Sequence, residues 1–181
     1  MMKYIACLAM LFVSPLVLAN DSQLQLGVLY AEDIQAVGLY AGLEVVDLAP
    51  QVAGYLDVSL LVSETYHAEE PVFGGVAVGL RTGFNSPVAP YAGLGVYVGQ
   101  NSHEHPAQQD KVDNDDDGFT DEIGETTVDN QWMSAIYPEL GMRIAWGQQF
   151  TLRTMARYMV SSAGRRQDDW FYGISFAFSQ Q

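Results

Sequence analysis

The chain has little cysteine and few basic residues. Cys7 is the one cysteine among its 181 residues, and it lies in the N-terminal segment, so disulfides and thiol chemistry are excluded from the rest of the chain. Lys and Arg together number 8 against 22 Asp and Glu, which gives a formal net charge of −14 at pH 7. Nucleic acid rewards basic protein faces, so this balance argues against a nucleic-acid partner.

The sequence also lacks a long apolar run beyond its N-terminus. No later segment is long and apolar enough for a transmembrane helix, although 49% of the residues are hydrophobic. The N-terminal segment has a basic residue at Lys3, an apolar stretch, and a small-residue cleavage site at Val17-Leu18-Ala19. This pattern predicts a signal peptide over residues 1–19, with a mature chain that starts at Asn20. A retained membrane anchor is the alternative, although the run is short for a spanning helix.

Eight segments of the chain alternate between apolar and polar residues with a period of two. Between Phe150 and Val160 the even-numbered residues are mostly apolar, whereas the odd-numbered residues include Arg153 and Arg157. Successive strand residues face opposite sides, so each segment has an apolar face and a polar face. The predicted strands are 23–31, 37–46, 52–63, 73–84, 89–99, 132–146, 150–160 and 170–179.

The connections between these segments differ in length at the two ends. The links after the second, fourth and sixth segments are short, and the other links are mostly longer and more polar. The longest link, residues 100–131, holds 10 acidic residues and one basic residue, Lys111. Short turns at one end and long loops at the other are typical of outer-membrane barrels, which have an even number of strands. The sequence therefore predicts an all-β fold over residues 20–181, an eight-stranded antiparallel up-and-down transmembrane β-barrel with residues 100–131 as an acidic outer loop.

Charged residues within the predicted strands fall on the face opposite the aliphatic residues. An Arg on the lipid face would cost about 2–4 kcal/mol near the membrane midplane, so these residues are assigned to the lumen. An eight-stranded barrel is narrow enough for side chains to fill it, and charges buried there must pair. The predicted lumen network consists of Glu44, Asp57, Arg81, Glu139, Arg143, Arg153 and Arg157. We interpret it as a structural plug, with a gated ion path as the alternative.

Three segments carry a family resemblance that extends over the mature chain. They are Pro90-Tyr91-Ala92-Gly93-Leu94-Gly95, Pro138-Glu139-Leu140-Gly141-Met142-Arg143 and the closing strand Trp170–Phe178. The chain resembles the small eight-stranded outer-membrane barrels of Gram-negative bacteria, the OmpA, OmpX and opacity-protein-like group. The closing strand is similar to the C-terminal signal read by the barrel-assembly machinery, although three residues follow its last aromatic residue. The resemblance implies location in the outer membrane, contact with its lipid and lipopolysaccharide, and the assembly machinery as a partner during biogenesis.

The acidic outer loop contains a regular run of carboxylates that begins at Asp113. Acids at positions one, three, five and nine, with Gly118 at position six, match the start of an EF-hand-like calcium loop and resemble the calcium repeats of thrombospondin-type and dockerin modules. Position twelve is Gly124 rather than an acid, and the acids that flank it offer a variant closure. The candidate calcium ligands are Asp113, Asp115, Asp117, Phe119 through its carbonyl, Asp121, Glu122 and Glu125. The sequence predicts a weak Ca²⁺ site here, and a solvated acidic loop is the alternative.

Two further groups of residues have the composition of a chemical site. His103 and His105 suit a transition metal, but the sequence gives them no fixed third ligand, and polar loop residues are the default interpretation. Ser63, Glu64 and His67 are the residues most suited to hydrolysis, yet nothing holds them together, and no histidine lies within a predicted strand. The sequence therefore predicts no enzyme and no catalytic residue.

A soluble lipocalin-like barrel is the main rival architecture. Its outer face would carry the Gly, Ala and Tyr residues of the polar set and few lysines, which makes a poor soluble surface. We therefore expect a monomeric outer-membrane barrel with a structural or surface-interaction role that binds calcium through its third outer loop. A narrow ion or small-solute channel and a lipid-modifying outer-membrane enzyme are the alternatives.

Overall fold

The computed structural model describes residues 22–63, 72–84, 86–106, 111, 118–120, 123, 126–147 and 149–179. Their strands are β1 (Ser22–Ala31), β2 (Ala36–Ala49), β3 (Val52–Ser63), β4 (Val72–Gly83), β5 (Val88–Pro106), β6 (Thr126–Trp146), β7 (Phe150–Ser161) and β8 (Asp169–Ser179). A short 3₁₀ helix, η1 (Arg165–Gln167), precedes β8. Among the residues listed above, no helix is long and apolar enough to span a membrane.

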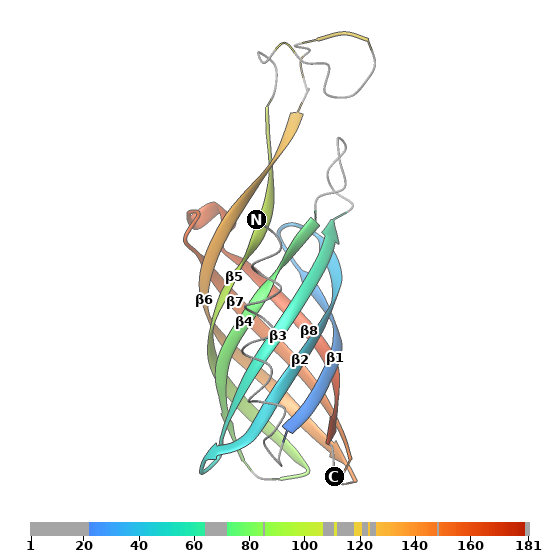
Figure 1. The fold of residues 1–181 in the computed structure, drawn as a ribbon, viewed down its shortest axis with the longest axis vertical. Helices are drawn as coiled ribbons and strands as arrows, with labels where there is room; N and C mark the ends of the chain where they lie inside the picture. The colour runs from blue at the N-terminus through green and yellow to red at the C-terminus, as the bar shows by residue number, and fades with distance from the viewer. Residues whose placement is uncertain are drawn as a thin grey trace.

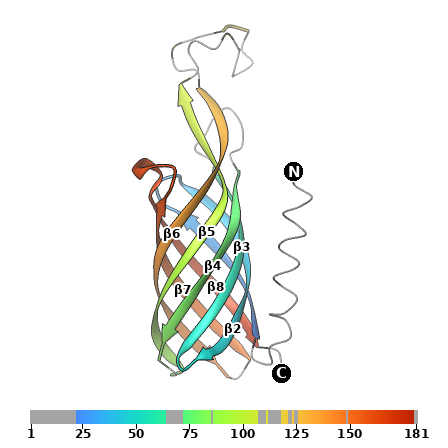
Figure 2. The same cartoon turned by 60° about the vertical axis from the view of Figure 1, so that its left-hand side comes forward.

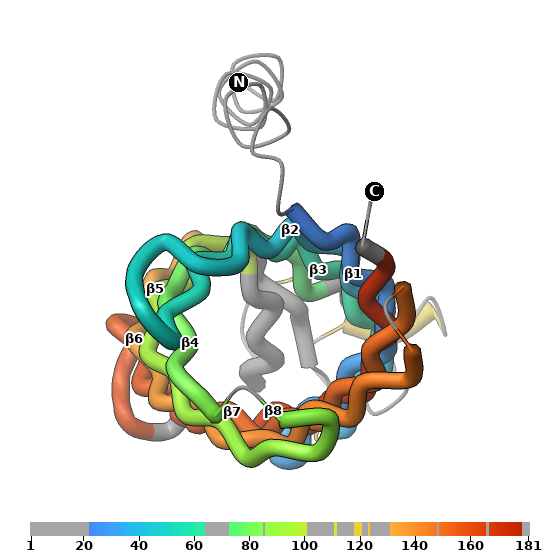
Figure 3. The backbone as a smooth tube through the Cα atoms, turned by 90° about the horizontal axis from the view of Figure 1, so that it is seen from below, coloured from blue at the N-terminus to red at the C-terminus, as the bar shows by residue number. Residues whose placement is uncertain are grey.

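The strands form one closed antiparallel barrel in chain order, and β1 closes it by pairing with β8 (Figure 1, Figure 3). This confirms the predicted fold class and the up-and-down order. Most predicted strand bounds differ from the observed ones by one residue at most. At β2 the strand continues to Ala49, through a register shift between Val45 and Ala49. We call the end with the short β2–β3, β4–β5 and β6–β7 connections the turn end and the opposite end the loop end.

The hairpin of β5 and β6 is longer than the sequence pattern predicted. Its two strands pair without interruption from Val88 opposite Ile144 to Pro106 opposite Thr126. The hairpin extends as a two-stranded arm past the loop end of the barrel (Figure 1, Figure 2). Strand pairing therefore reaches into both ends of the segment predicted as an acidic loop, residues 100–131. Residues 126–128, Thr-Thr-Val, are β-branched and favour this continuation.

The outer wall of the barrel is apolar, as the alternation predicted. Leu39, Leu94 and Leu140 lie on three different strands, and each is about two-thirds exposed, at 68%, 65% and 65%. Aromatic pairs lie near both ends of this wall. The ring centroids of Phe150 and Phe178 are 5.3 Å apart at the turn end, and those of Tyr158 and Trp170 are 5.0 Å apart at the loop end.

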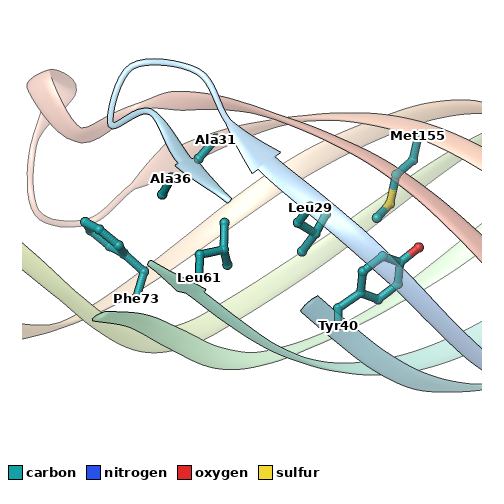
Figure 4. Packing of buried hydrophobic residues seen from close by; sticks show 7 residues of the cluster. All are labelled: Leu29, Ala31, Ala36, Tyr40, Leu61, Phe73 and Met155. Atoms are coloured by element: carbon teal, nitrogen blue, oxygen red, sulfur yellow. The ribbon is translucent and has the colours of Figure 1, made fainter. Parts of the chain in front are cut away.

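The core of the molecule is the barrel lumen itself. Two clusters of buried apolar residues fill it, mainly from the loop half of the strands. The first cluster contains Leu29, Ala31, Ala36, Tyr40, Leu61, Phe73 and Met155 (Figure 4). The second contains Tyr55, Ala77, Tyr97, Met133, Ala135, Tyr137 and Met159. The buried charged side chains occupy the middle of the lumen and its turn half.

Candidate functional site

Six charged side chains from five strands form one connected network inside the barrel, which we call the lumen network. Arg81 on β4 is its centre: its Nη1 lies 2.7 Å from Glu44 Oε2, and its Nε lies 2.6 Å from Glu139 Oε1. Arg157 Nη2 lies 2.6 Å from Asp57 Oδ2, and Arg157 also pairs with Glu139. Arg153 pairs with the second oxygen of Glu44 and completes the chain of contacts.

The lumen network is electrically balanced and shielded from water. Three arginines face three carboxylates, and each of the six residues is 5% exposed or less. A buried charge without a partner is costly, whereas a buried pair repays its desolvation only when its geometry and hydrogen bonds are good. Here each carboxylate contacts at least one guanidinium, so the buried charges neutralise one another. The interpretation of these residues as a structural plug stays a prediction.

Strand register brings the partners of the network together. Glu139 on β6 and Arg157 on β7 are direct cross-strand partners, and Arg81 on β4 is opposite Gly93 on β5. Gly93 in turn pairs with Glu139, so a residue without a side chain separates the Arg81 and Glu139 positions across β5. A Cβ atom at Gly93 would lie 3.4 Å from Arg81 Cγ and 3.4 Å from Glu139 Cβ. Both distances are ordinary van der Waals contacts, and the closest approach would be 2.9 Å to the Leu80 carbonyl oxygen, so a side chain at this position would press on the backbone of β4.

Tyrosines close the lumen next to the charges. The Tyr55 hydroxyl donates a hydrogen bond of 2.9 Å to the Tyr137 hydroxyl across the barrel. The Arg81 guanidinium lies 3.8 Å from the centroid of the Tyr55 ring, and the Arg157 guanidinium lies 5.0 Å from that of Tyr137. A Cβ atom on Gly95 would lie 2.5 Å from the Tyr137 ring, so the bulk of the tyrosine needs the glycine beside it.

One buried member of this region, Gln25, was not among the predicted lumen residues. Its side chain is fully buried on β1, where its Nε2 donates to Glu44 Oε2 at 3.3 Å and its Oε1 accepts from Arg81 Nη1 at 3.4 Å. The period-two alternation indicates that Gln25 faces the lumen, because it lies between the outward-facing Leu24 and Leu26. The predicted lumen network contains charged residues alone, so it does not include this neutral partner.

Arg143 differs from the prediction that joined it to the other six charges. It is half-buried near the turn end, and its Nη2 donates to the carbonyl oxygens of Phe84 and Ser86 at 3.2 and 3.3 Å. Among the described residues, no carboxylate forms an ion pair with it. Its position close to the end of β6 explains the difference, because it places the guanidinium beside the carbonyls of the β4–β5 turn rather than at the centre of the lumen.

A cavity of about 170 Å³ opens at the turn end of the barrel. Glu44, Asp47, Arg81, Arg143 and Arg153 are the charged residues of its wall. Arg153 Nη1 is buried and has no hydrogen-bond partner among the described groups. Beyond the lumen network, residues of the two apolar clusters occupy much of the loop half of the lumen.

A buried carboxylate at the loop end holds the β1–β2 turn. Asp169 Oδ1 accepts a hydrogen bond of 2.9 Å from the backbone N–H of Asp33, and the side chain is 4% exposed. The residue lies just beyond the Tyr158–Trp170 aromatic pair. Burial raises the pKa of the Asp169 carboxyl above its ordinary value, because the charged form loses water.

The other predicted sites fall largely outside the described residues. For the calcium site, Asp113, Asp115, Asp117, Asp121, Glu122 and Glu125 lie outside them, and Phe119 is described and exposed. Of the hydrolytic candidates, Glu64 and His67 also lie outside, whereas Ser63 is buried and donates a hydrogen bond of 2.7 Å to the Ile34 carbonyl. Among the side chains that are described, no group of three or more His, Cys, Asp or Glu is placed to hold a metal.

Solved structures with the same fold exist, although no known family model matches the sequence and no curated protein matches it. The crystal structure of the N-terminal β-barrel domain of Pseudomonas aeruginosa OprF is 13% identical, with a TM-score of 0.54 over 88% of this chain and 96% of that one. The crystal structure of Neisserial surface protein A (NspA) is 12% identical, with a TM-score of 0.58 over 88% of this chain and 96% of that one. At these identities the likeness is one of fold.

Proposed function

We propose that this chain is an outer-membrane β-barrel of a Gram-negative bacterium with a structural or surface-interaction role. The observation that carries the proposal is the inversion of the usual protein surface. Leucines such as Leu39 and Leu94 are largely exposed on the outer wall, while the charged pairs are buried in the lumen. In water this arrangement would be unstable, whereas in a membrane each residue meets the environment it prefers.

The aromatic pairs and the different connections at the two ends support one orientation of the barrel in the membrane. Phe150 and Phe178 at the turn end, and Tyr158 and Trp170 at the loop end, lie where aromatic girdles meet the two membrane interfaces. Short turns face the periplasm in such barrels, and long loops face outward. We therefore place the β5–β6 arm on the cell surface, among lipopolysaccharide, and infer that the barrel-assembly machinery inserts the chain as a monomer. The fold shared with Neisserial surface protein A is consistent with this placement.

The packed lumen supports a role without transport or catalysis. The lumen network spans five strands, and the Tyr55–Tyr137 hydrogen bond crosses the barrel beside it. A lipid-modifying activity would need a reactive group at the loop end, and there the Ser63 hydroxyl is buried and bonded to a carbonyl. We infer that the barrel is a scaffold and that its specific interactions reside in the outer segments, above all in the connection between β5 and β6.

A narrow channel is the second candidate, and the cavity at the turn end favours it. Arg153 lines the cavity, which is large enough to hold water, and its Nη1 has no hydrogen-bond partner among the described groups. For conduction, ions would also have to pass the lumen network and the apolar clusters of the loop half. The filled lumen therefore favours the scaffold.

Calcium binding by the outer loop remains part of the proposal. The carboxylates at Asp113, Asp115 and Asp117, with Gly118 after them, follow the ligand order of an EF-hand-like loop. The loop is carried at the tip of the β5–β6 hairpin, on the side that faces the medium in the proposed orientation. We propose weak Ca²⁺ binding that orders the tip of the arm.

Cell fractionation tests the proposed location. The protein should be recovered in the outer-membrane fraction, and unheated samples should migrate differently from boiled samples on a denaturing gel because the closed barrel resists unfolding. Recovery as a soluble periplasmic protein without a heat-dependent shift would contradict the proposal.

A further inference from the structure

Two arginines face each other across β6 and β7 at the turn end of the barrel, the end nearest the viewer in Figure 3. Arg143 on β6 and Arg153 on β7 are direct cross-strand partners, and both line the cavity of about 170 Å³. Residues directly opposite each other in an antiparallel pair share a face, and like charges in such a pair destabilise the sheet. The two guanidinium groups therefore need negative charge close to them.

The carboxylates around this pair supply that charge only in part. Glu44 pairs with Arg153 through Oε1, but its Oε2 lies 2.7 Å from Arg81 Nη1, so one carboxylate serves two arginines. Among the described residues no carboxylate pairs with Arg143, whose Nη2 donates to carbonyl oxygens of the β4–β5 turn. Asp47, the other acidic residue of the cavity wall, is exposed. The wall thus has three arginines against two carboxylates.

Arg153 also has a hydrogen-bond donor left over. Its side chain is 4% exposed, and its Nη2 donates to Glu44 and, at 3.2 Å, to Gln23 Oε1. Its Nη1 is buried and has no hydrogen-bond partner among the described groups. A buried donor without a partner costs free energy. Because Arg153 lines the cavity, a ligand with acceptor oxygens can satisfy this donor from there.

We propose that Arg143 and Arg153 bind a phosphate group in this cavity, either inorganic phosphate or the group of a small phosphate monoester. At pH 7 such a group carries a charge of about −1.5 to −2, which offsets two guanidinium groups, and it offers three acceptor oxygens. The planar fork of an arginine matches phosphate oxygens well. One water needs about 10–15 Å³ of such space, so the cavity has room for an anion of this size.

The ligand comes from the aqueous medium in this proposal, because the residues that bind it face the lumen and the outer wall meets lipid. In the orientation proposed above, the turn end opens to the periplasm, so the location of the ligand rests on that proposed function. Binding to the purified protein does not rest on it. A protein that fails to bind phosphate would still fractionate with the outer membrane, so the two proposals fail separately.

Calorimetric titration of the folded full-length protein with inorganic phosphate, in micelles of a detergent without phosphate, tests the site. We expect one equivalent to bind, and Arg143→Gln to weaken binding by about tenfold or more. Arg153→Lys keeps a positive charge beside Glu44 but removes the guanidinium fork, and it should weaken binding as well. Arg165→Gln is the matched control, because it removes the same charge from a side chain that is 87% exposed at the loop end, and it should bind as the wild type does.

Two further measurements complete the test. The heat-dependent gel shift shows for every variant that the barrel is folded. Phosphatidylglycerol added to the same micelles distinguishes a lipid headgroup from dissolved phosphate, and it should not displace inorganic phosphate. The inference is overturned if the wild type binds no inorganic phosphate, if phosphatidylglycerol displaces it, or if Arg143→Gln weakens binding no more than Arg165→Gln does.

Discussion

Glu139 on β6 and Arg157 on β7 are direct cross-strand partners, and their side chains form an ion pair in the barrel lumen. Glu139 also accepts a hydrogen bond of 2.6 Å from Arg81 Nε, so a single carboxylate holds two arginines from different strands. Removal of this one negative charge would leave three buried arginines with two carboxylates. The stability of the barrel should therefore depend strongly on Glu139.

The substitution Glu139→Gln, which keeps the shape of the side chain, should reduce the free energy of unfolding by about 3–5 kcal/mol. Urea titration of the folded barrel in lipid vesicles measures the change. Glu32→Gln is the matched control, because Glu32 is exposed at the loop end and its carboxylate accepts a hydrogen bond from the Tyr172 hydroxyl at 2.8 Å. The control should change stability by less than about 0.5 kcal/mol. Equal effects of the two substitutions would contradict a structural role for the lumen network.

Leu140, the next residue along β6, tests the opposite face. It is 65% exposed on the outer wall, so Leu140→Arg should reduce the free energy of unfolding in lipid vesicles by about 2–4 kcal/mol. Gln131→Arg, on the exposed arm beyond the barrel, should cost much less because it lies outside the hydrocarbon region. If Leu140→Arg were tolerated as well as Gln131→Arg, the apolar wall would not face lipid.

Period-two alternation is enough to predict the fold and most of the lumen, and the reason is geometric. A strand shifted by one residue would turn Arg153 and Arg157 onto the lipid face, so the two possible assignments of its faces differ greatly in free energy. The six charges that meet in the lumen network all follow from this rule. Their partners do not, because the pairing of Arg81 with Glu44 and Glu139 joins strands that are not neighbours and depends on how the barrel closes.

Local pattern predicted the ends of the strands less well. Residues 101–106 and 126–131 are polar on both faces, so they lack the contrast between faces that identified the other segments. Their pairing follows from the register that the barrel imposes on β5 and β6.

Calorimetric titration with Ca²⁺ tests the acidic loop. The wild type should show a heat of Ca²⁺ binding. The dissociation constant should be about 0.1–1 mM, as in extracellular calcium modules. The double variant Asp113→Ala/Asp117→Ala removes two of the proposed ligands and should abolish the signal. A titration without heat in the wild type, or an unchanged signal in the variant, would leave only the solvated-loop interpretation.

The raised pKa of Asp169 predicts that the contribution of this residue to the stability of the barrel depends on pH. Because burial raises the pKa of this carboxyl, the folded protein keeps its proton to a higher pH than the unfolded chain does. The contribution of Asp169 to stability is therefore fully present below the ordinary pKa of 3.8 and is lost as the pH rises through the raised value. Compared with Asp169→Asn, the wild type should lose stability as the pH increases over this window, measured by urea unfolding. A relative gain of the wild type would contradict the prediction.

Ion conductance through the folded protein in a planar lipid bilayer tests the central claim, a membrane barrel whose lumen is closed by its own side chains. The lumen network and the tyrosine pair across the barrel predict no steady conductance from protein that shows the heat-dependent gel shift. A steady, reproducible conductance from the same folded protein would contradict the account and favour the narrow channel.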